Sequence, residues 1–113
     1  MPQLVEPPVA RMLLQAVAHY HRFGRWFVRL FLVMPDHVHG LIAFPSQERM
    51  TAVVRDWKKY TSRVGGISWQ RDFFDHRLRS DESWEIKATY IRENPVRKGL
   101  VTNAGQWPWV YAP

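Results

Sequence analysis

Two histidines separated by a single apolar residue are the first feature of the sequence that could do chemistry. His37 and His39 flank Val38 inside an apolar run that is typical of a buried strand. Because side chains alternate between the two faces of a strand, both imidazoles are expected on one face and Val38 on the other. Neighbouring imidazoles can share a metal ion. The pair therefore predicts a metal site, held rigidly by the apolar residues on either side.

A polar stripe near the C-terminus offers a second set of reactive groups. Its members are spaced three or four residues apart, which places them on one face of an expected helix: Ser83, Lys87, Tyr90 and Asn94. Taken alone, the stripe is typical of a half-buried tyrosine among surface groups. Taken with the histidines, it indicates that the Asn94 carbonyl completes a metal site and that the Tyr90 hydroxyl is a nucleophile.

Such a combination suits the cleavage of a phosphodiester. A divalent ion held by two neutral imidazoles and an amide keeps its full charge and open coordination positions, and it acts as a Lewis acid on a non-bridging oxygen. Attack by Tyr90 would give a covalent phosphotyrosine and a free 3′ hydroxyl, so that the bond energy is kept for rejoining. Lys87 is expected to hold the phosphate or to assist the tyrosine.

The composition favours a nucleic-acid partner. Sixteen lysines and arginines against ten acidic residues give a formal net charge of +6, as expected for a protein that binds a polyanion. The absence of cysteine excludes disulfides, thiolate ligands and a thiol nucleophile. The longest apolar run, residues 30–35, is too short to span a bilayer, and the N-terminus does not resemble a signal peptide. We therefore expect no membrane association and a cytoplasmic location.

The positions of apolar residues, prolines and glycines predict a single α/β domain over residues 1–113. The second helix should begin after Ser46 as its cap, and Pro95 should end the last helix. The tail is expected to pack across the domain. The predicted elements are a helix at 9–22, strands at 25–33 and 37–44, a helix at 47–64, a strand at 67–78, a helix at 80–94 and a tail at 96–113.

Basic side chains in the second half of the sequence are candidates for contact with DNA. Each of them alone is typical of a solvated surface, whereas as a group they could follow a phosphate backbone. The candidates are Lys58, Lys59, Arg63, Arg71, Arg79 and Lys87.

The two motifs together resemble a known family. Residues 33–39 resemble the histidine-hydrophobe-histidine (HUH) motif of single-strand endonucleases. Residues 90–96, followed by Gly99 and Leu100, resemble the tyrosine helix of REP-associated tyrosine transposases, the insertion-sequence transposase-like branch. The similarity runs in order from about residue 9 to residue 109 and includes the segments around residues 57–63 and 69–79.

The resemblance implies a ferredoxin-like α/β domain, with helices packed on an antiparallel sheet, that nicks and joins single-stranded DNA beside a hairpin. It implies His37, His39 and Asn94 as ligands of Mg²⁺ or Mn²⁺ and Tyr90 as the nucleophile. Two positions depart from the family pattern. Asp36 stands where asparagine is usual, and residues 1–6 are too few for the strand that usually precedes the first helix.

The missing N-terminal strand leaves three explanations open: a partner donates the strand, the start codon is misplaced, or the chain is a decayed copy. An exposed sheet edge would also favour a homodimer. Two other functions compete with the enzyme. One is a non-catalytic DNA-binding remnant of such a transposase, and the other is a basic structural or RNA-associated protein.

Overall fold

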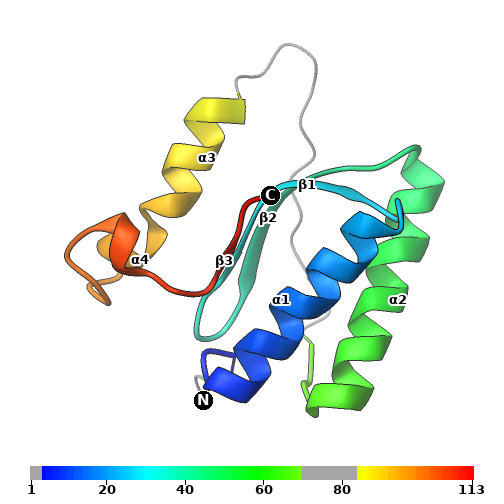
Figure 1. Ribbon diagram of the computed structural model, residues 1–113, viewed down its shortest axis with the longest axis horizontal. Coiled ribbons are helices and arrows are strands. Elements are labelled where there is room, and N and C mark those ends of the chain that lie inside the picture. The colour runs from blue at the N-terminus through cyan, green and yellow to red at the C-terminus, as the bar shows by residue number, and fades with distance from the viewer. Residues whose placement is uncertain (1–3, 70–83) are drawn as a thin grey trace.

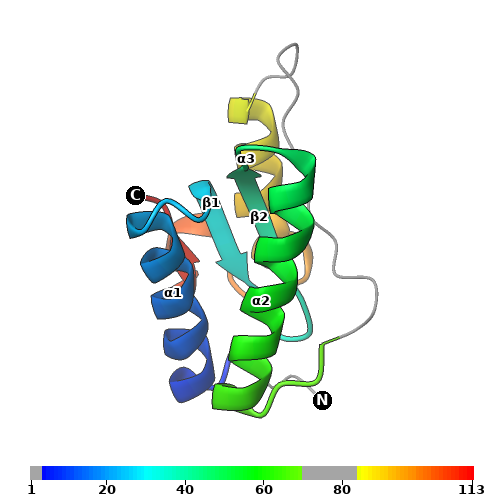
Figure 2. The same ribbon diagram turned by 90° about the vertical axis from the view of Figure 1, so that its right-hand side faces the viewer.

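The computed structural model describes residues 4–69 and 84–113, which form three layers around a small sheet. The sheet is antiparallel with the strand order β2–β1–β3. Figures 1 and 2 show two helices on one face of it and the third long helix on the other. The predicted α/β class, with helices packed on an antiparallel sheet, is confirmed.

The two longest helices, α1 and α2, lie together in one layer. α1 and α2 lie on one face of the sheet, and α3 lies on the other, followed by the one-turn helix α4 (Figure 1). The bounds are α1 Pro7–Arg22, β1 Phe27–Val33, β2 Val38–Ala43, α2 Gln47–Gly65, α3 Trp84–Arg92, α4 Asn94–Arg97, the 3₁₀ helix η1 Ala104–Gln106 and β3 Val110–Tyr111.

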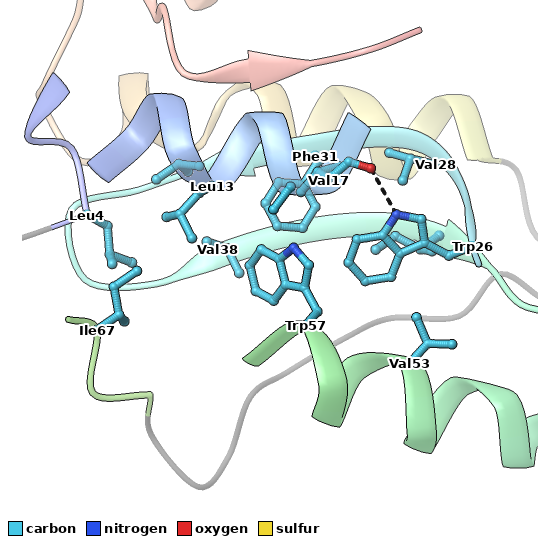
Figure 3. Packing of buried hydrophobic residues seen from close by; sticks show 13 residues of the cluster. Leu4, Leu13, Val17, Trp26, Val28, Phe31, Val38, Val53, Trp57 and Ile67 are labelled. Carbon is cyan, nitrogen blue, oxygen red and sulfur yellow. Dashed lines mark hydrogen bonds between the residues drawn. The ribbon is translucent and has the colours of Figure 1, made fainter. Parts of the chain in front are cut away.

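The larger core lies between the sheet and the layer of α1 and α2. Trp26, Phe31 and Trp57 pack ring against ring there, with centroids 5.6–6.4 Å apart. The indole Nε1 of Trp26 donates a hydrogen bond of 3.1 Å to the carbonyl of Val17, as Figure 3 shows. This bond satisfies a buried donor and ties the start of β1 to α1.

The smaller core joins the sheet to α3. Leu30 and Leu32 of β1 and Leu41 of β2 pack there against Ala88 and Ile91 of α3. In the register of the hairpin, Leu41 pairs with Leu30, and His39 pairs with Leu32. Because residues two apart in a strand share a face, His39 lies on the face of the sheet that α3 covers.

The local sequence signals for the first two helices and strands are confirmed. Ser46 caps α2, and its hydroxyl accepts a hydrogen bond of 3.1 Å from the backbone nitrogen of Arg49. The predicted strand at 67–78 falls mostly outside the described residues, and its first three residues, 67–69, are not in a strand. Residues 80–83 of the last predicted helix also lie outside them.

The last predicted helix ends close to the expected position. The expected helix runs to about Asn94 and stops at Pro95; α3 ends at Arg92, and residues 94–97 form the separate turn α4. Pro95 is the physical reason, because it has no N–H to donate to the carbonyl four residues earlier and its ring collides with that carbonyl. Proline is well tolerated in a first turn, which is where it lies in α4.

The two ends of the chain pack differently. The C-terminal tail supplies β3, which pairs with β1, and the indole of Trp107 donates to the carbonyl of Val33 at 2.9 Å. Ahead of α1, residues 4–6 are not in a strand, and the nitrogen of Leu4 donates to the carbonyl of Pro35. Within residues 4–69 and 84–113, β1 is the one strand paired with β2.

Candidate active site

The turn between β1 and β2 brings the two histidines together. The nitrogen of Met34 donates to the carbonyl of His37 at 2.8 Å, which closes a tight turn through Pro35 and Asp36. Beyond the turn, the Nε2 atoms of His37 and His39 lie 2.9 Å apart, with the two rings nearly perpendicular. The imidazoles thus share one face, as their spacing predicts.

Asn94, which lies in the C-terminal part of the chain, approaches the same two histidines. Its side chain is buried, and its Nδ2 atom lies 2.5 Å from Nε2 of His39. Asn94 is the first residue of α4, directly after the break that follows α3. Rotation of the amide by half a turn would present its oxygen to the same point.

The two histidine nitrogens have the separation of adjacent ligands of a divalent ion. Two adjacent ligands of an octahedral ion, each about 2.1 Å from it, lie about 3.0 Å apart. The 2.9 Å between the two histidine nitrogens matches that separation. In the described part of the chain, no cluster of three His, Cys, Asp or Glu side chains could hold a metal, so a site here depends on the amide of Asn94 as its third ligand.

Burial keeps one of these imidazoles neutral. Loss of solvent, followed by the charges of His37 and Arg97, lowers the pKa of His39 from 6.5 to about 4. At neutral pH the ring therefore carries a lone pair that is available to a metal ion.

Asp36 sets the tautomer of the other histidine. Its Oδ1 atom lies 2.7 Å from Nδ1 of His37, and the hydrogen bond from His37 is the main cause of a lowered pKa for the Asp36 carboxyl. A proton held on Nδ1 leaves the Nε2 lone pair of His37 directed at His39. Sequence reasoning noted Asp36 only as a departure from a family pattern, although its place beside His37 was a signal for this role.

Tyr90 and His39 border one pocket. The pocket has a volume of about 410 Å³ and lies between β2 and α3, and its lining includes both His39 and Tyr90. Lys87 also lines it, one turn before the tyrosine on α3. Tyr90 is 63% exposed, so a large substrate can reach it. The remaining lining residues are Gly40, Leu41, Ile86 and Ile91.

Arg97 is a neighbour of Tyr90 that sequence reasoning missed. Its Cζ atom lies 4.0 Å from the centroid of the tyrosine ring, and its Nη2 atom donates a hydrogen bond of 2.7 Å to the Tyr90 carbonyl. In a continuous helix the seven-residue spacing would place both on one face. Because Pro95 interrupts the helix between the two residues, their spacing in the sequence did not predict that they lie together.

The predicted DNA-contacting residues fall into three groups. Lys87 lies at the pocket. Lys58, Lys59 and Arg63 border a shallow hollow on α2 together with Ser68 and Trp69, and α2 lies on the opposite face of the sheet from α3. Arg71 and Arg79 lie outside the described residues. The structure therefore does not bring the α2 cations beside the histidines, and their contact with DNA stays a prediction.

Comparisons with known proteins agree with this arrangement. The model of the family described as "Transposase IS200 like" matches residues 3–94. A REP-associated tyrosine transposase of Escherichia coli strain K12 is 26% identical over 102 residues, which cover 88% of this chain and 62% of that protein. This chain thus spans less than two thirds of the length of that relative.

A solved structure is similar over nearly the whole chain. It is described as a REP-associated tyrosine transposase bound to a REP hairpin, and it superposes with a TM-score of 0.78 at 26% identity. The match covers 96% of this chain and 67% of that one. The resemblance expected from the two motifs is confirmed, and the chain belongs to the IS200-like transposase family.

Proposed function

We propose that this chain is a metal-dependent endonuclease and strand transferase for single-stranded DNA, a transposase that acts through Tyr90. One observation carries the proposal. Three donor side chains, from His37, His39 and Asn94, converge beside the pocket that Tyr90 also lines. His39 belongs both to the candidate ligands and to the lining of the Tyr90 pocket, and a nucleophile next to an ion site suits phosphodiester cleavage.

The ligand set suits Mg²⁺ or Mn²⁺. His37 and His39 would present neutral nitrogens and Asn94 its amide oxygen, with the Asp36 carboxylate orienting His37. When bound, the ion would polarise a non-bridging oxygen of the scissile phosphate and stabilise the negative charge that develops there. The low pKa of His39 means that no proton has to leave this ligand at neutral pH.

The reaction transfers a phosphoryl group to the protein and back. The Tyr90 oxygen forms a bond to phosphorus and gives up its proton to solvent, while the bond to the 3′ oxygen breaks and that oxygen takes up a proton. The products are a 5′-phosphotyrosine and a free 3′ hydroxyl. Attack by a 3′ hydroxyl on the phosphotyrosine reverses the step and joins strands. Lys87, which lines the same pocket, would hold the phosphate.

Single-stranded or hairpin DNA is the proposed partner. The net charge of +6 favours a polyanion. The solved structure that resembles this chain is described as bound to a REP hairpin. The basic side chains around the α2 hollow would follow the DNA backbone away from the cleaved bond. A cytoplasmic location is part of this proposal, because the DNA substrate would be met there. In the described ranges, no helix is long and apolar enough to cross a membrane.

The test is a covalent adduct. Protein, Mn²⁺ and a 3′-end-labelled single strand that carries a hairpin are incubated, denatured and separated by electrophoresis. Label should remain on the wild-type protein and be lost in Tyr90→Phe. Tyr60→Phe is the matched control, because Tyr60 is also exposed but lies on α2. An adduct that persists in Tyr90→Phe would exclude Tyr90 as the nucleophile.

A second candidate function is a DNA-binding remnant without catalysis. The observation that favours it is the edge position of β2, whose one paired strand in the described ranges is β1. Because β2 carries the histidines and is paired on one side, it would hold these ligands less firmly than a central strand. A strand from elsewhere, such as one from a second copy in a homodimer, could complete this edge. This function predicts salt-sensitive DNA binding, no cleavage and no metal-dependent gain in thermal stability.

A further inference from the structure

We propose that Arg97 is a positioning residue that holds the Tyr90 ring in place for attack. The inference rests on the proposed role of Tyr90 as the nucleophile. It adds a residue to that site, and it assigns to the short helix α4 the function of coupling the nucleophile to the ligand Asn94.

The contact between Arg97 and Tyr90 has two parts. The guanidinium lies over the tyrosine ring, with Cζ 4.0 Å from the centroid, which is within the range of a cation–π interaction. The same guanidinium donates to the tyrosine's own carbonyl oxygen at 2.7 Å. Because the backbone bond anchors the cation, the ring that stacks on it is held relative to α3 rather than to a freely moving side chain.

Tyr90 needs such a restraint because little else packs around it. Tyr90 is 63% exposed, whereas Ile91, the next residue of α3, is buried in the smaller core. An exposed side chain exchanges between rotamers on a short timescale unless a contact selects one of them. Stacking on Arg97 selects the rotamer that keeps the ring at the pocket.

The position of Arg97 is fixed by the turn that also positions Asn94. α4 begins at Asn94 and ends at Arg97, and the nitrogen of Lys98 donates to the Asn94 carbonyl at 3.0 Å. Gly99 follows with φ 73°, a left-handed conformation that glycine adopts without strain, and so reverses the chain. A single turn therefore carries a candidate metal ligand at one end and the restraint on the nucleophile at the other.

The contact between Arg97 and Tyr90 leads to a specific prediction for the rate of adduct formation. At saturating metal, loss of the restraint should leave DNA binding intact but lower the fraction of time that the hydroxyl spends in position to attack. Misplacement of a reacting group by about 1 Å can cost about a hundredfold in rate. For an exposed ring that still visits the right rotamer, we expect a loss of about tenfold or more at saturating DNA.

The experiment compares Arg97→Gln and Arg97→Lys with Arg92→Gln. Arg92 is the matched control, because it is an exposed arginine that ends α3 two residues after Tyr90. Single-turnover rates of adduct formation are measured with Mn²⁺ at saturating hairpin DNA, together with the Kd for the DNA. We expect Arg97→Gln to lower the rate without changing the Kd, Arg97→Lys to recover part of it, and Arg92→Gln to match the wild type. An unchanged rate in Arg97→Gln would overturn the proposal.

A second readout does not depend on catalysis. In the wild-type protein the Hδ protons of Arg97 should be shifted upfield in the NMR spectrum by the ring current of Tyr90, and Tyr90→Leu should abolish the shift. If the wild type forms no adduct, the proposed function fails and the NMR shift still tests the contact. Absence of the shift in the wild type would overturn the inference even if the adduct forms.

Discussion

Asn94 and His39 are 55 residues apart in the sequence, yet their side chains meet, with Nδ2 of the amide 2.5 Å from Nε2 of the imidazole. The contact joins β2, which carries the histidines, to α4, which carries the amide. Asn94 is one of the two buried polar residues in the described ranges. A buried amide whose partner is an imidazole, beside a second imidazole, supports the proposed ligand set.

Metal binding by the histidine pair is expected to stabilise the fold. At a hundredfold excess over its Kd, a ligand that binds only the folded state adds about 2.7 kcal/mol. Mn²⁺ should therefore raise the Tm of the wild type, and His37→Ala or His39→Ala should lose most of this rise. His19→Ala, a change at an exposed histidine of α1, is the control. An equal rise in all four proteins would mean that the metal binds elsewhere.

The Asp36 carboxylate is expected to strengthen metal binding through His37. Partners that orient a metal-ligating histidine commonly contribute about 10–100-fold in affinity. Asp36→Asn should therefore weaken Mn²⁺ binding, measured by isothermal titration calorimetry, by about tenfold. Asp56→Asn removes a carboxylate that pairs with Arg25 at 2.9 Å and should leave the affinity unchanged. Equal affinities in Asp36→Asn and the wild type would show that the 2.7 Å contact does not support the ligand.

Acid is expected to destabilise the metal-free protein through His39. Its pKa is lowered from 6.5 to about 4, so between these values the unfolded chain binds a proton that the folded protein does not. Stability should therefore fall as the pH falls through this window. Asp36 does not oppose the trend, because its lowered pKa lies below 3.8.

Urea unfolding at about pH 7 and about pH 4.5 measures this loss. His39→Gln should lose less stability between the two conditions than the wild type. The other four histidines are common to both proteins, so the difference between the two losses reports on the replacement of His39. Equal losses in the two proteins would contradict the assignment of the lowered pKa to His39.

The basic hollow on α2 is expected to contact DNA phosphates. For single strands, each phosphate contact contributes about −0.7 to the slope of log K against log salt concentration. Lys59→Ala and Arg63→Ala should each weaken hairpin binding and reduce the magnitude of that slope by about this amount. Arg11→Ala, at an exposed position of α1, is the control. Slopes identical to that of the wild type would remove α2 from the binding surface.

The parts of the fold that were predictable from the sequence depend on local patterns. The apolar stripes define α1 and α2, the Ser46 cap marks the start of α2, and strand alternation places both histidines on one face. Each of these signals needs only a few neighbouring residues. The same holds for the family resemblance, since both motifs are short and contiguous.

The parts that were not predictable depend on how distant segments meet. The meeting of Asn94 with the histidines was expected from their chemistry, but the sequence alone does not show that the chain forms a new turn, α4, after α3 ends. The stacking of Arg97 on Tyr90 depends on the same turn. The pairing of β3 with β1 likewise depends on the path of the tail, because a two-residue strand has no periodicity to detect.

The most direct measurement is the identity of the residue that carries the DNA. Wild-type protein is incubated with Mn²⁺ and hairpin-bearing single-stranded DNA, digested with nuclease and protease, and mapped by mass spectrometry. A 5′-phosphonucleotide on Tyr90, absent when His37 and His39 are both replaced by alanine, is expected. A modification on another residue, or on Tyr90 without any need for the histidines, would contradict a shared site for the ligands and the nucleophile.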